Sequence, residues 1–157
     1  MNIEIEMENG GIIKAELYPD IAPITVENFA KLIEDNFFDG LIFHRVIPGF
    51  MIQGGGYSAD GTHKDAESIK GEFDKNGVNN PLKHTRGVLS MARTMFPNSA
   101  SSQYFIMHDD APHLDGQYAA FGKVTEGMEV VDEIAQTPTD MQDKPIEDMI
   151  IKTIRLI

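Results

Sequence analysis

Short apolar segments, separated by glycine, proline and asparagine, are the feature that most restricts the fold of this chain. Over residues 2–7 apolar side chains alternate with polar ones, which is the two-residue period of a strand with one buried face. Asn9-Gly10 follows, a dipeptide typical of a tight hairpin turn, and we expect the return strand at about residues 12–17. A chain that starts in this way is predicted to be rich in β-structure.

The pattern changes to a helical period at about residues 25–36, where Val26, Phe29 and Ile33 recur on one face. A second helix is predicted around residues 128–135. Further strands are predicted at residues 41–47, 50–53, 69–73, 87–92, 103–107, 119–124 and 149–157. Many short strands with two isolated helices predict a β-barrel or sandwich with helices packed outside. We find no repeat or linker and expect one domain over residues 1–157.

Composition excludes several classes of protein. The chain has 25 acidic and 13 basic residues, for a formal net charge of −12, so it lacks the basic surface that binds nucleic acid. It has no cysteine, which excludes disulfides and thiolate chemistry. No segment approaches the ~20 apolar residues needed to span a bilayer, and the N-terminus lacks the pattern of a signal peptide. We expect a cytoplasmic monomer with no membrane partner.

The most informative segment is residues 43–55, with the sequence FHRVIPGFMIQGG. If it forms a regular strand at its start, Phe43 and Arg45 lie on one side and His44 on the other. An arginine in this position is, by itself, compatible with an ordinary surface residue. We expect His44 to be a buried, hydrogen-bonded structural residue and not an acid or base.

This segment closely resembles the signature of the cyclophilins. The similarity continues in the family's order through LSMA at 89–92, PNSASSQYFI at 97–106, LDG at 114–116 and FGKV at 121–124. It covers about residues 2–157, and the short polar loop at 56–70 is similar to the compact bacterial branch. The resemblance implies a closed eight-stranded antiparallel β-barrel capped by two α-helices, with the active site on its outer face.

The same resemblance implies a peptidyl-prolyl cis-trans isomerase that accelerates rotation about Xaa-Pro bonds, with Arg45 as its catalytic residue. The residues implied for the proline pocket are Phe50, Met51, Phe105 and Leu114. Those implied to hold the substrate backbone or line the groove are Gln53, Ala92, Arg93 and Gln103. The implied partners are proline-containing peptides and unfolded or native proteins, and neither a cofactor nor a metal is implied. A proline-binding chaperone or scaffold module with incidental turnover is the alternative.

Strand alternation alone does not identify every pocket residue. Phe50 and Met51 are neighbours, so either one could be a core residue instead. Alternation likewise requires only that one of Tyr104 and Phe105 faces the groove, and the resemblance selects Phe105.

Two groove positions depart from the best-known eukaryotic cyclophilins. This chain has His113 where those proteins have tryptophan, and Tyr118 where they have histidine. Both replacements keep a ring that can make one polar contact, so we expect His113 and Tyr118 to contact substrate and isomerase activity to survive. Because the tryptophan would supply a large face and an indole donor, we expect only weak cyclosporin binding.

Rival functions find little support in the sequence. Residues 54–59, GGGYSA, match a dinucleotide-binding fingerprint, but the polar run that follows has no helical period. His108, Asp109, Asp110 and His113 lack the spacing of a recognised metal site, so we interpret them as surface residues. No serine, histidine and aspartate occur in a nucleophile-elbow context, so triad chemistry is not predicted.

Overall fold

The first two strands form the hairpin that the Asn-Gly turn predicts. β1 (Asn2–Met7) pairs antiparallel with β2 (Ile12–Leu17). Gly10 lies in the turn at φ +92°, a conformation that residues with a side chain adopt only under strain. The Asn9 side chain accepts a hydrogen bond from the backbone N–H of Gly11, which supports the turn.

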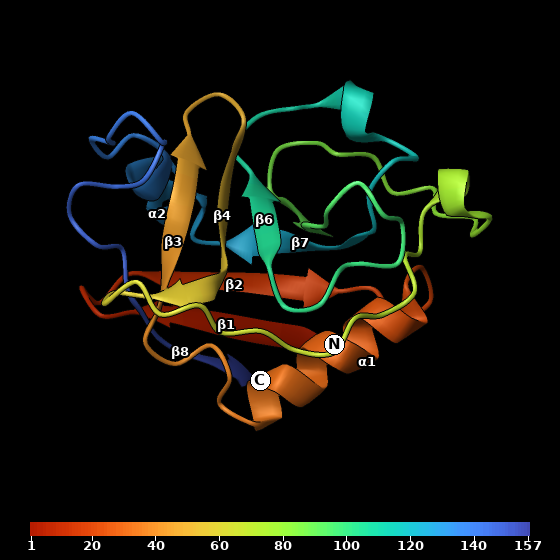
Figure 1. Cartoon of the computed structure of the whole chain (residues 1–157), viewed down its shortest axis with the longest axis horizontal. Coiled ribbons are helices and arrows are strands. Elements are labelled where there is room, and N and C mark those ends of the chain that lie inside the picture. The colour runs from red at the N-terminus through yellow and green to blue at the C-terminus, as the bar shows by residue number, and fades with distance from the viewer.

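Eight strands form one antiparallel sheet in the computed structural model, which describes residues 1–157 (Figure 1). The other strands are β3 (Leu41–Ile47), β4 (Met51–Ser58), β5 (Val88–Met91), β6 (Tyr104–Met107), β7 (Ala120–Glu126) and β8 (Ile151–Leu156). Their order is β3-β4-β6-β5-β7-β2-β1-β8. The sheet curls until its edges meet, since the Gly40 N–H donates to the carbonyl of Ile151 and the Phe43 N–H to that of Met149. This nearly closed barrel confirms the expected architecture.

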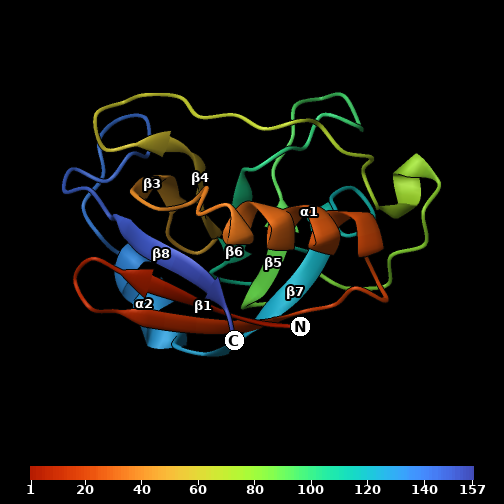
Figure 2. The same ribbon diagram turned by 90° about the horizontal axis from the view of Figure 1, so that it is seen from below.

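Two α-helices pack on the outside of the sheet. α1 (Pro23–Glu34) has proline in its first turn, where a missing N–H removes no helical hydrogen bond, and it contacts β8. α2 (Met128–Ala135) contacts β2, β3 and β4, at a different place on the barrel (Figures 1 and 2). Two short 3₁₀ helices, η1 (Asp74–Asn76) and η2 (Pro112–Leu114), lie in the long connections. None of these helices has both the length and the apolar character needed to cross a membrane.

Buried apolar side chains form two separate clusters. The larger one fills the barrel and includes the inner face of α1, where the ring of Phe29 lies 5.2 Å from that of Tyr104 and 5.1 Å from that of Phe121. The members of the smaller, outer cluster are Met51, Val88, Phe105, Met107, Ala111, Leu114 and Ala120. Successive residues of β6 alternate between the two clusters, so that one strand contributes to both.

The strand predicted at residues 69–73 is absent, and that prediction is wrong. The Ile69 N–H donates to the carbonyl of Ala100, but no ladder of paired residues follows. Phe73 is buried in the larger cluster, and the backbone is so close-packed that a Cβ on Gly71 would lie 2.2 Å from the carbonyl oxygen of Pro97. Apolar residues here are buried by packing against the barrel, without pairing in the sheet.

Candidate active site

A bulge in β3 determines the direction of Arg45. Phe43 lies opposite Gly54 and Arg45 opposite Gln53, so that His44 is an extra residue between the two pairs. The extra residue reverses the alternation beyond it. Phe43 is therefore fully buried inside the barrel, whereas Arg45 is exposed on the outside. The prediction that Phe43 and Arg45 share one side of the strand is wrong for this reason.

The outer apolar cluster forms the floor of a hollow of about 150 Å³ beside Arg45. The residues that line it are Arg45, Phe50, Met51, Gln53, Ala92, Arg93, Phe105, Leu114 and Tyr118. Met51 and Phe105 point outward into this hollow, while Tyr104 belongs to the barrel interior. Phe50 lies in the turn between β3 and β4 and also lines the hollow, so both residues of the Phe50-Met51 pair reach it.

A chain of side-chain hydrogen bonds orients the guanidinium of Arg45. Its Nη1 donates to Oε1 of Gln53 over 3.3 Å, and Nε2 of Gln53 donates to Oε1 of Gln103 over 2.9 Å. Gln103 does not line the apolar hollow but an adjacent polar one of about 260 Å³, which Gln53 and Arg93 share. One edge of the Arg45 guanidinium is thus held by its hydrogen bond to Gln53, and the other N–H donors are free to bind a ligand.

Arg93 forms a fixed wall between the two hollows. Its guanidinium carbon lies 4.7 Å from the ring centroid of Phe73 and 4.6 Å from that of Tyr118, so the cation is sandwiched between two rings. Its Nη2 donates to the carbonyl of Gln117 over 2.5 Å, and its Nη1 to that of Thr94 over 2.9 Å. Since these donors are engaged with the protein's own backbone, Arg93 contributes shape to the groove.

The two unusual aromatic positions lie at the edge of the same site. Tyr118 meets Phe105 edge-on, with ring centroids 5.9 Å apart. His113 lies on η2 with its ring 5.9 Å from that of Phe50, next to the hollow but outside its lining. Of the sequence-predicted site residues, all except Gln103 and His113 line the apolar hollow itself.

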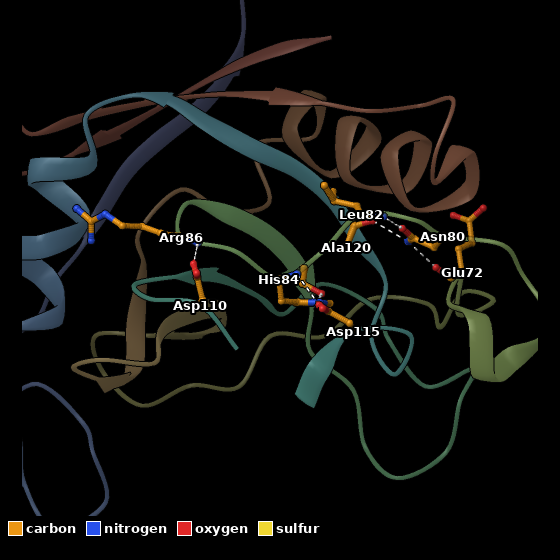
Figure 3. Close-up of polar contacts among 9 residues, drawn as sticks. Glu72, Asn80, Leu82, His84, Arg86, Asp110, Asp115 and Ala120 are labelled. Carbon is orange, nitrogen blue, oxygen red and sulfur yellow. Dashed lines mark hydrogen bonds and ion pairs between the residues drawn. The ribbon is translucent and has the colours of Figure 1, made fainter. Parts of the chain in front are cut away.

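Sequence reasoning missed a buried polar residue beneath the site. His84 is 1% exposed and lies against Phe105, with ring centroids 6.1 Å apart and nearly parallel. Its ring nitrogens contact Asp115 and Ser90, and Figure 3 shows the contact with Asp115. His84 sits in a polar stretch without periodicity, so no pattern in the sequence marked it.

The structure also bears on the rival interpretations. Gly54 to Ser58 continue β4 and no helix follows, so the dinucleotide fingerprint lacks its required context. His108 accepts a hydrogen bond from the Gly49 N–H and contacts Asp132, and no three acidic or histidine side chains gather as a metal site requires.

His44 differs from its expected role. It packs on Tyr57, with ring centroids 4.7 Å apart, but its buried Nδ1 has no hydrogen-bond partner. The prediction of a buried, hydrogen-bonded His44 is therefore wrong, since the residue is only half-buried and this nitrogen is unpaired. Burial, with smaller contributions from Arg45 and His63, lowers the pKa of His44 to about 4, so the ring is neutral at pH 7.

Comparisons with known proteins agree with this architecture. Residues 2–156 match the family model described as cyclophilin type peptidyl-prolyl cis-trans isomerase/CLD. The chain is 49% identical over 145 residues to a peptidyl-prolyl cis-trans isomerase of Acinetobacter baylyi, covering 88% of this chain and 74% of the relative. It is 48% identical over 123 residues to peptidyl-prolyl cis-trans isomerase B of Bacillus subtilis, covering 78% and 82% of the two chains.

A solved structure gives the same result. The cyclophilin-type isomerase of Cryptosporidium parvum, crystallised in the presence of the dipeptide Ala-Pro, superimposes with a TM-score of 0.84 at 34% sequence identity. The superposition covers 98% of this chain and 97% of that one. The family match, the bacterial relatives and the shared barrel confirm the resemblance, and this chain belongs to the cyclophilin-type peptidyl-prolyl cis-trans isomerases.

Proposed function

We propose that Arg45 is the catalytic residue and that the apolar hollow beside it holds the pyrrolidine ring of the substrate proline. The observation that carries this proposal is the junction of a charged donor with an apolar pocket. Arg45 is exposed and has one weak side-chain hydrogen bond, while Phe50, Met51, Phe105 and Leu114 line the adjoining hollow. A substrate with its proline ring in the hollow and its prolyl nitrogen beside the Arg45 guanidinium would use both the apolar pocket and the charged donor.

The chemistry requires little else. Rotation about a peptide bond has a barrier of ~18–20 kcal/mol because the C–N bond has partial double-bond character. No covalent bond breaks, so the reaction needs neither a nucleophile nor a proton donor. In the twisted amide the prolyl nitrogen regains a lone pair, and a guanidinium N–H can donate a hydrogen bond to it. The guanidinium of Arg45 suits this role because it is a rigid fork of donors that stays charged.

Magnitudes indicate that Arg45 cannot act alone. A ten-thousandfold acceleration requires about 5.4 kcal/mol off the barrier. One hydrogen bond to a charged group contributes roughly 1.5–3 kcal/mol, and a donor held in a dry site about 2.7–4 kcal/mol. The apolar hollow must supply the remainder by positioning the proline and by excluding water, which stabilises the planar amide.

The substrates that we propose are proline-containing peptides and unfolded chains. The related Cryptosporidium parvum protein was crystallised in the presence of Ala-Pro, which supports a prolyl ligand at this site. Uncatalysed prolyl isomerisation takes tens of seconds and often limits folding. An isomerase acting on unfolded chains would therefore assist folding in the compartment where it resides.

Exchange NMR on a short Ala-Pro peptide tests the proposal. We expect native protein to speed cis-trans exchange, and Arg45→Ala to reduce the rate at least about a hundredfold, the loss of about 2.7 kcal/mol. Arg45→Lys keeps the charge and loses the fork, so it should also lose most of the rate. Arg155→Ala is the matched control, since Arg155 on β8 pairs with Glu4 and Glu6 on β1 and does not line the hollow. Bound peptide without faster exchange would instead support the proline-binding module.

A further inference from the structure

His84 links three parts of the structure that meet under the apolar hollow. Its ring Nε2 lies 2.8 Å from Oγ of Ser90, on β5. Its ring Nδ1 lies 3.1 Å from Oδ1 of Asp115, the residue after Leu114. Its backbone N–H donates to the same carboxylate oxygen over 2.6 Å, and its carbonyl accepts from the Ala111 N–H over 2.8 Å. One residue thus holds both ends of the segment that carries η2.

The donors and acceptors in this chain have only one arrangement for a neutral ring. The Asp115 carboxylate can only accept, so Nδ1 of His84 carries the proton. Nε2 is then an acceptor, and the Ser90 hydroxyl donates to it. Burial lowers the pKa of His84 more than the neighbouring carboxylate raises it, which agrees with a neutral ring.

This order of residues resembles a nucleophilic triad, but the geometry excludes nucleophilic attack by the serine. Ser90 is 0% exposed and His84 is 1% exposed, so no substrate carbonyl can reach the hydroxyl. What the hydrogen-bond chain can do is fix the ring of His84 in space. Phe105 lies nearly parallel to that ring, with an interplanar angle of 22°.

The backbone that carries His84 is itself held on both sides, as Figure 3 shows. Before it, Nδ2 of Asn80 donates to the carbonyl of Ala120 over 2.9 Å. After it, the backbone N–H of Arg86 donates to Oδ1 of Asp110 over 2.8 Å. A ring anchored in this way is a rigid support for the side chains that rest on it.

We propose that His84 is a positioning residue for prolyl isomerisation, because its imidazole sets the spacing between Phe105 and the Leu114–Asp115 turn across the proline pocket. The proposal rests on the assignment of Phe105 and Leu114 to that pocket. The van der Waals contacts of one pocket wall with the proline ring are similar in the planar and the twisted amide, and a small shift of that wall leaves the hollow closed to water, which is the part of its contribution that favours the twisted amide. Loss of its position should therefore weaken substrate binding and change the rate at saturation much less.

Two pairs of variants test this role. His84→Phe keeps a flat ring against Phe105 but removes both ring hydrogen bonds. Asp115→Ala removes the carboxylate, whereas Asp115→Asn keeps an oxygen that can accept from both N–H groups of His84. Thr25→Val is the matched control, because it removes a buried hydrogen bond from Thr25 to Glu72 and neither residue lines the hollow.

The measurements are kcat and KM for the Ala-Pro peptide, together with the dissociation constant of the Ala-Pro dipeptide from NMR titration. For His84→Phe and Asp115→Ala we expect KM and the dissociation constant to rise about tenfold, with kcat within about threefold of native. Asp115→Asn should stay near native. Thr25→Val should lower the melting temperature and leave KM unchanged.

The outcomes distinguish failure of the positioning role of His84 from failure of the catalytic role of Arg45. Unchanged binding in folded His84→Phe and Asp115→Ala overturns the positioning role, even if Arg45→Ala abolishes turnover. Equal loss of binding in Asp115→Ala and Asp115→Asn also overturns it, since the accepting oxygen would then be irrelevant. If His84→Phe does not fold, the Asp115 pair alone decides. Should native protein show no turnover, the dipeptide dissociation constants still report on His84, and only the proposed catalytic function fails.

Discussion

The hydroxyl of Tyr104 is an unsatisfied polar group in the middle of the barrel. The residue is 0% exposed, and its Oη has no hydrogen-bond partner. Burial raises the pKa of this phenol above its usual range, so the hydroxyl is uncharged at neutral pH. Its ring, by contrast, is well packed, edge-on to Phe29 at 5.2 Å and to Phe38 at 5.7 Å.

Replacing Tyr104 with phenylalanine should therefore stabilise the protein. An unpaired buried hydroxyl lowers stability by about 1–3 kcal/mol, and Tyr104→Phe removes it while keeping both ring contacts. The single atom that is lost leaves a small void, which offsets part of the gain. We expect the free energy of unfolding to rise by about 1 kcal/mol, which is about 2–4 °C in melting temperature for a domain of this size.

Urea unfolding followed by circular dichroism measures the effect. Tyr18→Phe is the control, because Tyr18 is only partly buried and its loss of a hydroxyl should change the unfolding free energy by less than about 0.5 kcal/mol. Isomerase activity should be unaffected, as Tyr104 does not line the hollow. A Tyr104→Phe protein less stable than native by 1 kcal/mol, roughly one lost hydrogen bond, would refute the reasoning, since the hydroxyl would then have a partner in solution.

Two further predictions concern pH and ligand binding. Because folding lowers the pKa of His44 to about 4, the folded state binds fewer protons than the unfolded state between that value and about 6.5. His44 should therefore stabilise the fold less as pH falls through this range. We expect the free energy of unfolding to change less between pH 7 and pH 5 in His44→Phe than in native protein. Equal changes in the two proteins would contradict this prediction. Cyclosporin should bind weakly and His113→Trp should bind it more tightly, as isothermal titration can measure, whereas a nanomolar dissociation constant for native protein would be incompatible with our interpretation of His113.

Local signals in the sequence were sufficient for most of the fold. The Asn9-Gly10 turn and the alternation before it located the first hairpin, and the 3.6-residue period located α1. These signals failed at residues 69–73, where an apolar side chain is buried although its backbone does not pair in the sheet. Phe73 is buried like a strand residue, yet its segment crosses the barrel surface as an extended connection. Composition cannot distinguish those two kinds of burial.

The site was less predictable because the direction of Arg45 depends on a β-bulge that interrupts the regular alternation of β3. Strict alternation puts Arg45 inside with Phe43, and only the extra residue His44 brings it out. A bulge has no reliable signature in one sequence. His84 was invisible for another reason, since its partners Ser90 and Asp115 lie 6 and 31 residues away and meet it only in the folded chain.

Alternation along the strands places core residues and residues of the hollow next to each other in the sequence but on opposite sides of the barrel wall. On β4, Ile52 packs inside the barrel while Met51 and Gln53 reach the hollow outside. On β6, Tyr104 is internal and Phe105 external. The lining of the hollow can therefore be altered without opening the main core, because the two sets of side chains share a backbone but belong to different clusters. The outer set packs in a small cluster of only seven buried residues. A polar support such as His84 adds to the alignment of so small a cluster, which is a physical reason for a buried histidine beneath an apolar pocket.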